Sequence, residues 1–307
     1  MAMIKLIVYS YFVLSDEWIA ARTTSVVRMF GLFFFVSTFL SAQTDSIAFQ
    51  LAQAERDFAK SAGSTGIRSA FLANLDDQSV VFYPRPVNAK ETISAEGETP
   101  GSLVWSPVVV EVSSSGDLGF TTGPSEYRSG DSTDNSVHYG CFVSMWKKNI
   151  GGAWKVILDI GLGYPEHARR EEKVRVRQLH QRFVDRSATQ ESARSSLLRS
   201  DLEFSQAETE KGTDVALVKF ATEDVRVYRP GFFPAEGSEQ IRAVLKDEKL
   251  ARFTCTDGQV SGSGDIGFTY GLAVDATSDT SNCVRIWRKE NSWKVVVDLL
   301  KPWKPKK

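Results

Sequence analysis

Two stretches of similar sequence decide the fold, Val112-Ser113-Ser114-Ser115-Gly116-Asp117-Leu118-Gly119-Phe120 and Val260-Ser261-Gly262-Ser263-Gly264-Asp265-Ile266-Gly267-Phe268. Each places a Ser/Gly/Asp cluster between apolar residues, which is typical of a tight turn joining two antiparallel strands. The second stretch follows the first by 148 positions. A repeat at this distance predicts that a whole domain is duplicated.

The repeat extends outward from both turns in the same order. Three further pairs of blocks match: Phe82-Tyr83-Pro84 with Tyr228-Arg229-Pro230, Trp146-Lys147-Lys148 with Trp287-Arg288-Lys289, and Trp154-Lys155-Val156-Ile157-Leu158-Asp159 with Trp293-Lys294-Val295-Val296-Val297-Asp298. The spacing changes only between blocks, so the length differences fall in loops. We therefore predict one domain over residues 43–165 and a second over residues 192–303, with a charged linker at 166–191 and a basic tail at 304–307. The linker is expected to be a solvated segment or surface helix, since its charges have no single sign.

Each copy shows the same order of elements. Apolar residues at helical spacing predict an opening helix around Ile47–Phe58, and around Leu197–Phe204 in the second copy. A second helix, a short strand ended by proline and a short helix follow. Four strand-like runs close each copy, at 103–113, 118–128, 138–147 and 154–162, and at 253–261, 266–275, 281–288 and 293–300. Helices followed by an antiparallel meander predict an α+β fold with the helices packed on one sheet face.

Composition excludes several classes of protein. The 307 residues allow about two domains on a prior of roughly 150 residues each. The 37 basic and 38 acidic residues give a net charge of −1, so no general basic field exists to bind nucleic acid. Three cysteines exclude a disulfide scaffold and are interpreted as free thiols rather than a Cys255–Cys283 bridge. No Cys/His spacing indicates a metal site and no Gly-rich phosphate loop is present, so we expect neither metal nor cofactor.

The N-terminus is typical of an export signal. An uncharged apolar core at 29–40 follows Arg22 and Arg28 and precedes Ser41-Ala42, which predicts a signal segment over residues 1–42 with cleavage after Ala42. The protein is then secreted or periplasmic, without stable membrane insertion once the signal is removed. An uncleaved membrane anchor is the alternative. Translation starting at Met29, with residues 1–28 not made, is a second open question, because export signals normally begin at the start codon.

The ordered motifs resemble the SnoaL-like group of the nuclear transport factor 2-like superfamily, especially its secreted bacterial members of unassigned activity. The resemblance rests on Ser115-Gly116-Asp117-Leu118-Gly119-Phe120-Thr121-Thr122-Gly123 together with the Trp-Lys-Lys and Trp-Lys-Val blocks, and it covers both copies. It implies a cone-shaped fold, in which a curved sheet and helices surround a pocket. Family members often dimerise through the sheet, so a tandem chain is expected to form an internal pseudo-dimer, with a homodimer as the alternative.

The resemblance also implies where isomerase groups would lie. Ketosteroid isomerase uses an Asp base with a Tyr and a protonated Asp as oxyanion donors. The base position corresponds to Tyr83 and Arg229. The Tyr position corresponds to Phe58 and Phe204, and the Asp position to Phe142 and Cys283. None of the three roles is filled in either copy, so this isomerase mechanism is not expected.

Asp159 and Asp298 interrupt apolar strands at matching positions. A carboxylate in an apolar strand is costly unless it is paired or hydrogen-bonded. By strand alternation Asp159 shares a face with Lys155 and Ile157, and the resemblance points that face into the cone. Two interpretations remain open: a ligand anchor or general acid/base, or a structural carboxylate bonded by a helix or loop.

We therefore predict an exported protein with two pockets for a small, largely apolar ligand and no assigned catalysis. The predicted ligand-binding residues are Phe58, Phe82, Tyr83, Phe142, Asp159, Phe204, Tyr228, Arg229 and Asp298. One alternative is a lyase- or isomerase-type enzyme using Asp159 or Asp298 as general acid/base. Another is a protein-interaction module that binds partners through the sheet face.

Overall fold

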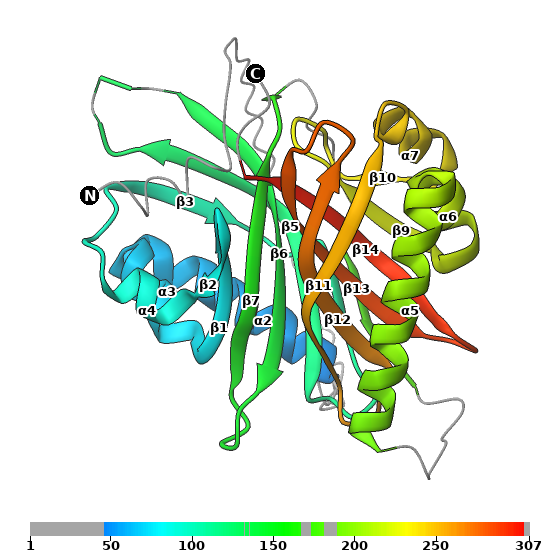
Figure 1. Cartoon of the computed structure of the whole chain (residues 1–307). Coiled ribbons are helices and arrows are strands. Elements are labelled where there is room, and N and C mark those ends of the chain that lie inside the picture. The colour runs from blue at the N-terminus through cyan, green and yellow to red at the C-terminus, as the bar shows by residue number, and fades with distance from the viewer. Residues whose placement is uncertain (1–45, 132, 135, 167–172, 181–188, 304–307) are drawn as a thin grey trace, which may run out of the picture.

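The computed structural model describes residues 46–131, 133–134, 136–166, 173–180 and 189–303. Two sheets lie in the middle, and the helices of each half cover the outside (Figure 1). The chain is therefore an α+β protein whose layers run helices, sheet, sheet, helices. We call the side of each sheet toward its own helices the helix face, and the side toward the other sheet the contact face. The predicted signal segment at 1–42 and tail at 304–307 lie outside the described residues.

The described residues of the first half form three helices and eight strands. Its helices are α2 (Ile47–Thr65), α3 (Ile67–Asn74) and α4 (Ala89–Ser94). Its strands are β1 (Leu75–Tyr83), β2 (Arg85–Asn88), β3 (Gly101–Trp105), β4 (Val109–Val112), β5 (Leu118–Ser129), β6 (Val137–Lys148), β7 (Trp154–Gly163) and β8 (Arg175–Gln178). They form one sheet in the order β2-β1-β7-β6-β5-β4-β8, with β3 also paired to β5.

The second half repeats this layout. Its helices are α5 (Gln190–Lys211), α6 (Thr213–Phe220) and α7 (Gly237–Leu245). Its strands are β9 (Ala221–Tyr228), β10 (Ala235–Glu236), β11 (Leu250–Val260), β12 (Ile266–Asp275), β13 (Thr280–Lys289) and β14 (Trp293–Pro302). They form a sheet in the order β10-β9-β14-β13-β12-β11. We call the space between the helices and the helix face of each sheet the first cone and the second cone.

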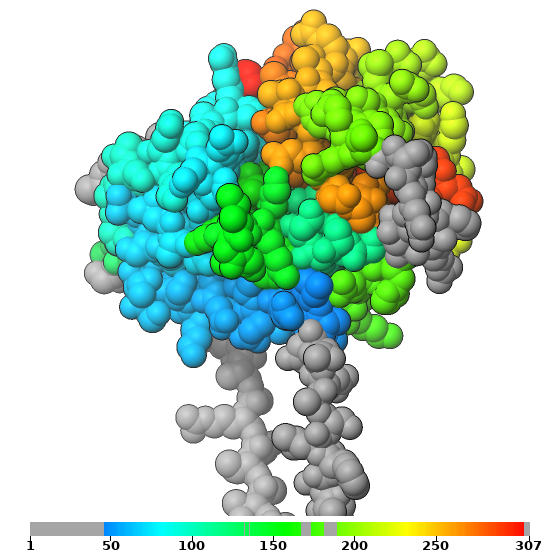
Figure 2. All heavy atoms as spheres, turned by 90° about the horizontal axis from the view of Figure 1, so that it is seen from below, coloured from blue at the N-terminus to red at the C-terminus, as the bar shows by residue number. Residues whose placement is uncertain are grey.

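The two contact faces pack against each other. One buried cluster draws its members from both sheets, including Phe120, Met145 and Leu158 from the first and Phe268, Ile286 and Leu299 from the second. The rings of Phe82 and Tyr270 meet across the halves, with centroids 6.0 Å apart. Burying each such side chain contributes about 1.5–3 kcal/mol. Seen from below, the two halves form one continuous body (Figure 2). The chain makes an internal pseudo-dimer, and the face required by the protein-interaction alternative is covered by the other half.

Two local features differ from the sequence expectation. The run at 103–113 is divided into β3 and β4, because Pro107 falls inside it and proline has no N–H for the sheet. The expected linker contains β8, which pairs in parallel with β4 and extends the first sheet. Arg177 of β8 then joins an ion cluster that links the halves, in which Arg288 Nη1 lies 3.0 Å from Glu111 Oε2.

Candidate functional site

The predicted site residues divide between the cones and the contact faces. Phe58 and Phe142 lie in the buried core of the first cone, and Phe204 lies in that of the second. Phe82 and Tyr228, in contrast, belong to the cluster between the sheets. Phe82 and Tyr228 therefore do not line the cones as predicted. Val81 lies on the helix face of β1, and because neighbouring side chains of a strand point to opposite faces, Phe82 points toward the other sheet.

Tyr228 forms hydrogen bonds with both halves of the chain. Its hydroxyl lies 2.8 Å from Thr122 Oγ1 of the first half and accepts a hydrogen bond from Arg226 Nε at 2.8 Å. The side chain is buried. Tyr228 therefore has a structural role at the contact face. Tyr83, at the end of β1, is only partly buried and lies on the same side of its strand as Val81.

Asp159 lies on the helix face of β7, as expected, although the residues that share this face differ from the prediction. The pairing of β6 with β7 shifts between Met145 and Trp146, so that Ile157 is an extra residue. Val156 and Asp159 consequently share the helix face, while Ile157 and Leu158 both pack between the sheets. The buried Asp159 Oδ1 accepts a hydrogen bond from Ser144 Oγ at 2.7 Å.

Glu55 is a buried carboxyl group that the sequence interpretation missed. It lies on α2, one turn before Phe58, and its exposed fraction is 0%. Its Oε1 accepts from Trp105 Nε1 at 2.6 Å, and its Oε2 accepts from Thr121 Oγ1 at 2.5 Å and Trp146 Nε1 at 2.9 Å. Burial raises the pKa of Glu55 to about 7, and the charge of Asp159 adds to the rise, although the three hydrogen bonds oppose it. The first cone thus contains two neighbouring buried carboxyl groups.

The second cone has a matching acid on its opening helix. Asp201 of α5 stands at the position of Glu55, and its Oδ1 accepts from Thr269 Oγ1 at 2.8 Å. Trp287 Nε1 in turn donates to Thr269 Oγ1 at 3.1 Å. An acid on the opening helix, three residues before a buried Phe in both copies, is the sequence signal that could have identified Glu55.

Two buried arginines, Arg285 and Arg229, form ion pairs in the second cone. Arg285 is 1% exposed, with Nη1 2.9 Å from Asp201 Oδ1 and Nε 3.4 Å from Asp298 Oδ1. It also bonds Glu208, whose pKa burial raises well above its usual range. Arg229 Nη2 lies 2.7 Å from Asp298 Oδ2. Asp298 is thus held by two arginines, which favours the structural interpretation for this aspartate.

The strand register is identical in three rows on the helix faces of the two sheets. The outer row is Trp105-Ser125-Gly140-Gly163 in the first sheet and Phe253-Ala273-Ser281-Pro302 in the second. The middle row is Gly123-Phe142-Gly161 and Gly271-Cys283-Leu300. The inner row is Thr121-Ser144-Asp159 and Thr269-Arg285-Asp298. These rows allow the two cones to be compared position by position.

Of the ten paired positions in these rows, the first cone has the smaller side chain at four and the larger one at three. In the second cone Ala273, Cys283 and Leu300 form their own apolar cluster with Leu250 and Phe253. In the first cone Gly161 replaces Leu300 and Ser144 replaces Arg285. Phe142, Trp105 and Ser125 are instead larger than their counterparts Cys283, Phe253 and Ala273. The strands around Asp159 are thus lined mainly by glycine and serine.

Ser125 lies in this small-residue region. It is 3% exposed, and its Oγ has no hydrogen-bond partner among the described residues. It shares the helix face with Thr121 and Tyr127, because β5 pairs with β6 without a bulge. A buried hydroxyl without a partner costs about 1–3 kcal/mol. A group that bonds Ser125 Oγ would recover that cost.

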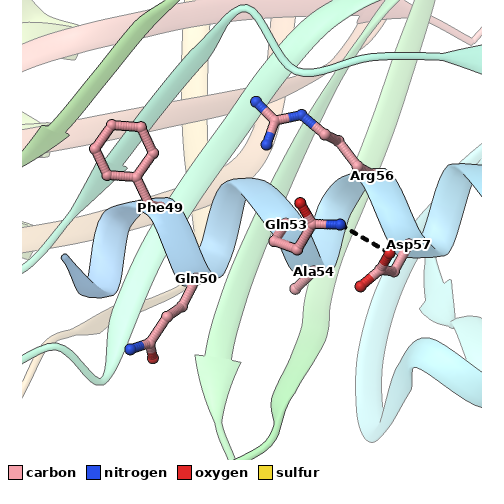
Figure 3. Close-up of a pocket in the computed structure, with 6 residues that line it drawn as sticks. All are labelled: Phe49, Gln50, Gln53, Ala54, Arg56 and Asp57. Atoms are coloured by element: carbon pink, nitrogen blue, oxygen red, sulfur yellow. Dashed lines mark hydrogen bonds between the residues drawn. The ribbon is translucent and has the colours of Figure 1, made fainter. Parts of the chain in front are cut away.

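A separate hollow of about 420 Å³ lies on the outer side of α2, away from the three rows and from Glu55 and Asp159. The residues that line it all come from that helix: Phe49, Gln50, Gln53, Ala54, Arg56 and Asp57 (Figure 3). Gln53 Nε2 donates to Asp57 Oδ1 at 2.9 Å within it. These side chains are mostly exposed, so the hollow presents an ordinary helix surface and is not our candidate site.

Two further observations concern metals and membranes. Within the described ranges, no group of three or more His, Cys, Asp or Glu side chains is placed to hold a metal ion. The three cysteines form no disulfide with one another, and Cys141 and Cys283 are buried while Cys255 is exposed. Among the helices in the described part of the chain, none is long and apolar enough to cross a membrane.

No protein-family model matches the chain, and no curated protein matches it. Among solved structures, an NTF2-like protein from Cytophaga hutchinsonii is 14% identical over 36% of this chain and 97% of its own, with a TM-score of 0.31. A ketosteroid isomerase-like protein from Parabacteroides distasonis is 20% identical over 41% and 96%, with a TM-score of 0.30. A protein from Planctomyces limnophilus is 13% identical over 39% and 98%, with a TM-score of 0.31.

Proposed function

We propose that the protein is a small-molecule-binding protein whose ligand site is the first cone. The observation that supports this most is Ser125, a buried hydroxyl without a described partner on a sheet face lined by Gly140, Gly161 and Ser144. Binding sites combine apolar walls with a few placed polar groups. Phe142 and Trp105 supply the walls here, while Ser125 and Asp159 supply the polar groups.

In the second cone the protein's own side chains occupy the positions that match the proposed ligand site, so we assign this cone a structural role. Its matching positions hold Leu300 and Arg285, and Arg285 is bonded to acids from α5 and β14. A ligand entering there would have to displace a buried ion network, which costs several kcal/mol. Two pockets were expected from the sequence, whereas we propose that only the first cone binds a ligand.

A proton-transfer enzyme is the second candidate, and Glu55 favours it. A carboxyl group whose pKa is about 7 exchanges protons readily at neutral pH. Asp159 lies near enough for its charge to act on Glu55, so the pair could divide the roles of acid and base. Both oxygens of Glu55 already accept hydrogen bonds from the protein, which favours binding over catalysis.

Native mass spectrometry of protein purified from its own host tests the binding proposal. The expected result is one small organic molecule bound per chain. Gly161→Leu, which introduces the leucine found at the matching position 300, should abolish the adduct. The matched control is Gly63→Leu, because a Cβ added at this exposed glycine of α2 meets no atom within 4 Å. An adduct that persists in folded Gly161→Leu would contradict a site in the first cone.

We also propose that the protein is exported. The support is the basic, apolar and small-residue order of residues 22–42. Mass determination of the protein from its host tests this, and a mature chain beginning at Gln43 is expected.

A further inference from the structure

Residues 95–100 cross the outer end of the first cone, and we call them the crossing segment. They join α4 to β3. At one end, burial raises the pKa of Tyr83, the last residue of β1, and the charge of Glu96 adds to the rise. At the other end, the carbonyl of Pro100 accepts a hydrogen bond from the Tyr127 hydroxyl of β5 at 3.1 Å. Because β7 and β6 lie between β1 and β5 in the sheet, the crossing segment spans these two strands.

The crossing segment lies over the small-residue part of the helix face. Tyr127 and Ser125 share that face of β5, and Ser125 is two residues nearer the inner row. On β6 and β7, the strands that the segment spans, Gly140 and Gly163 continue the row of Ser125. A molecule that approaches Ser125 Oγ from this end of the cone therefore meets the crossing segment first.

Two polar atoms of the crossing segment are buried without a hydrogen-bond partner among the described residues. They are Oγ1 of Thr99, a residue that is 5% exposed, and Oε1 of Glu96. Burying a polar group without a hydrogen bond is unfavourable, and contact with water would satisfy both atoms. The closed position of the segment is therefore less stable than a fully bonded one, which favours opening.

The bond that fastens the middle of the crossing segment is weak. The Arg68 guanidinium donates to the carbonyls of Ile93 and Ser94 at 3.1 and 2.8 Å, which holds the end of α4 in place. Within the segment, Oε1 of Glu98 accepts from the backbone N–H of Arg68 at 2.9 Å, and this bond is exposed. An exposed carboxylate near a helix N-terminus adds little to stability. The segment can therefore move while α4 stays fixed.

The matching segment of the second half is fastened by a buried arginine. Residues 246–249 join α7 to β11 there. Glu248 accepts hydrogen bonds from Nε and Nη2 of Arg229, and from Thr213 Oγ1 at 2.7 Å. Arg229 is 5% exposed, so its charge-assisted bonds to Glu248 are shielded from water and stronger than exposed ones. In the first half Tyr83 takes the place of Arg229, so the crossing segment lacks this arginine.

We propose that the crossing segment is a lid, which opens to admit a ligand to the first cone and then closes over it. This inference rests on the proposed function, since it supplies the entry path of the same site. Gly101, where the lid meets β3, has a φ of +122°, and glycine at such a hinge tolerates changes of backbone angle. Ligand groups that bond Thr99 Oγ1 or Glu96 Oε1 would stabilise the closed position.

The rate of thiol labelling tests the lid. Ser125→Cys in the full chain is treated with N-ethylmaleimide, and peptide mass spectrometry follows each labelled position. The thiol at position 125 should react at least about tenfold faster than the buried Cys283 of the second cone, because local opening is more frequent than global unfolding. Adding Glu98→Ala, which removes the bond to Arg68, should raise the rate at position 125 by about two- to fivefold and leave that of Cys283 unchanged. Glu91→Ala, at an exposed acid of α4, is the matched control and should change neither rate.

The outcomes separate the lid from the proposed function. Labelling at position 125 no faster than at Cys283, or equal rates with Glu98→Ala and Glu91→Ala, would overturn the lid and leave the ligand site standing. If Ser125→Cys does not fold, Thr99→Cys decides, with the same expected rates, because this residue is buried within the lid itself. The labelling needs no ligand, so the lid is tested even if host-purified protein carries no adduct, a result that would overturn the proposed function.

Discussion

Asp117 and Asp265 bind each other's turns across the pseudo-dimer. Asp117 Oδ2 accepts from the backbone N–H of Gly262 at 2.9 Å, and Asp265 Oδ2 accepts from that of Ser114 at 3.0 Å. Between them, the Oγ atoms of Ser115 and Ser263 are 2.8 Å apart. Reciprocal contacts of this kind are those of a twofold-symmetric interface. The turns that identified the duplication in the sequence are therefore also the place where the two copies meet.

The first prediction concerns these aspartates. Replacing either Asp117 or Asp265 by alanine should lower the free energy of unfolding by about 1–3 kcal/mol, because each change removes hydrogen bonds to a charged group. Asp265→Ala should cost more, since Asp265 is buried and Asp117 is only partly so. Urea denaturation measures both changes. Asp247→Ala, at a side chain 88% exposed, is the control, and equal effects in all three variants would count against the account.

The second prediction concerns pH. The pKa of Glu55 is raised to about 7 from 4.5, so the folded state binds more protons than the unfolded state between these values. Stability should therefore fall as pH rises through this window, by about 3 kcal/mol from Glu55 alone. Glu55→Gln carries no titratable proton, so its unfolding free energy should change less over the same window.

Thermal unfolding at several pH values measures this difference. Glu203→Gln is the control, because it removes an exposed carboxyl group from the other opening helix, α5. A Glu55→Gln profile parallel to that of wild type would show that Glu55 does not hold its proton in the folded protein.

The third prediction concerns the ion network of the second cone. Arg285→Met should lower the free energy of unfolding by about 3–5 kcal/mol, because Asp201, Glu208 and Asp298 would lose the central cation that they share. Arg252→Met, at an exposed position of β11, should change stability by less than about 0.5 kcal/mol. Comparable losses in the two variants, measured by denaturant unfolding, would refute a structural role for the network.

The fourth prediction concerns Ser125. Ser125→Ala reproduces the alanine found at the matching position 273 and removes a hydroxyl without a described partner. The ligand-free protein should be as stable as wild type or up to about 1–3 kcal/mol more stable. Ligand binding should weaken, because the ligand loses a hydrogen bond. A large loss of stability without ligand would show that this hydroxyl already has a structural partner.

The repeat made most of the fold predictable. Matching blocks around the Ser/Gly/Asp turns predicted the α+β layers and the meander, and the family resemblance implied the packing of one sheet on the other. The division at Pro107 and the pairing of β8 with β4 were not predicted, since the first depends on a single missing N–H and the second on a contact between distant segments.

The candidate site was less predictable than the fold. The placement of Asp159 on the helix face followed from the resemblance, but the bulge at Ile157 is invisible to simple alternation. Phe82 and Tyr228 were assigned to the wrong face because aromatic residues are equally suited to a core and to an interface. Glu55 could have been found by comparing the copies, because an acid recurs at position 201.

The most direct test of the central claim is a crystal structure of the protein purified from its own host. We expect electron density for one organic molecule in the first cone, bonded to Ser125 and Asp159, and Arg285 in the second cone bonded to Asp201 and Asp298. A first cone filled by its own side chains, or a molecule bound in the second cone, would contradict it.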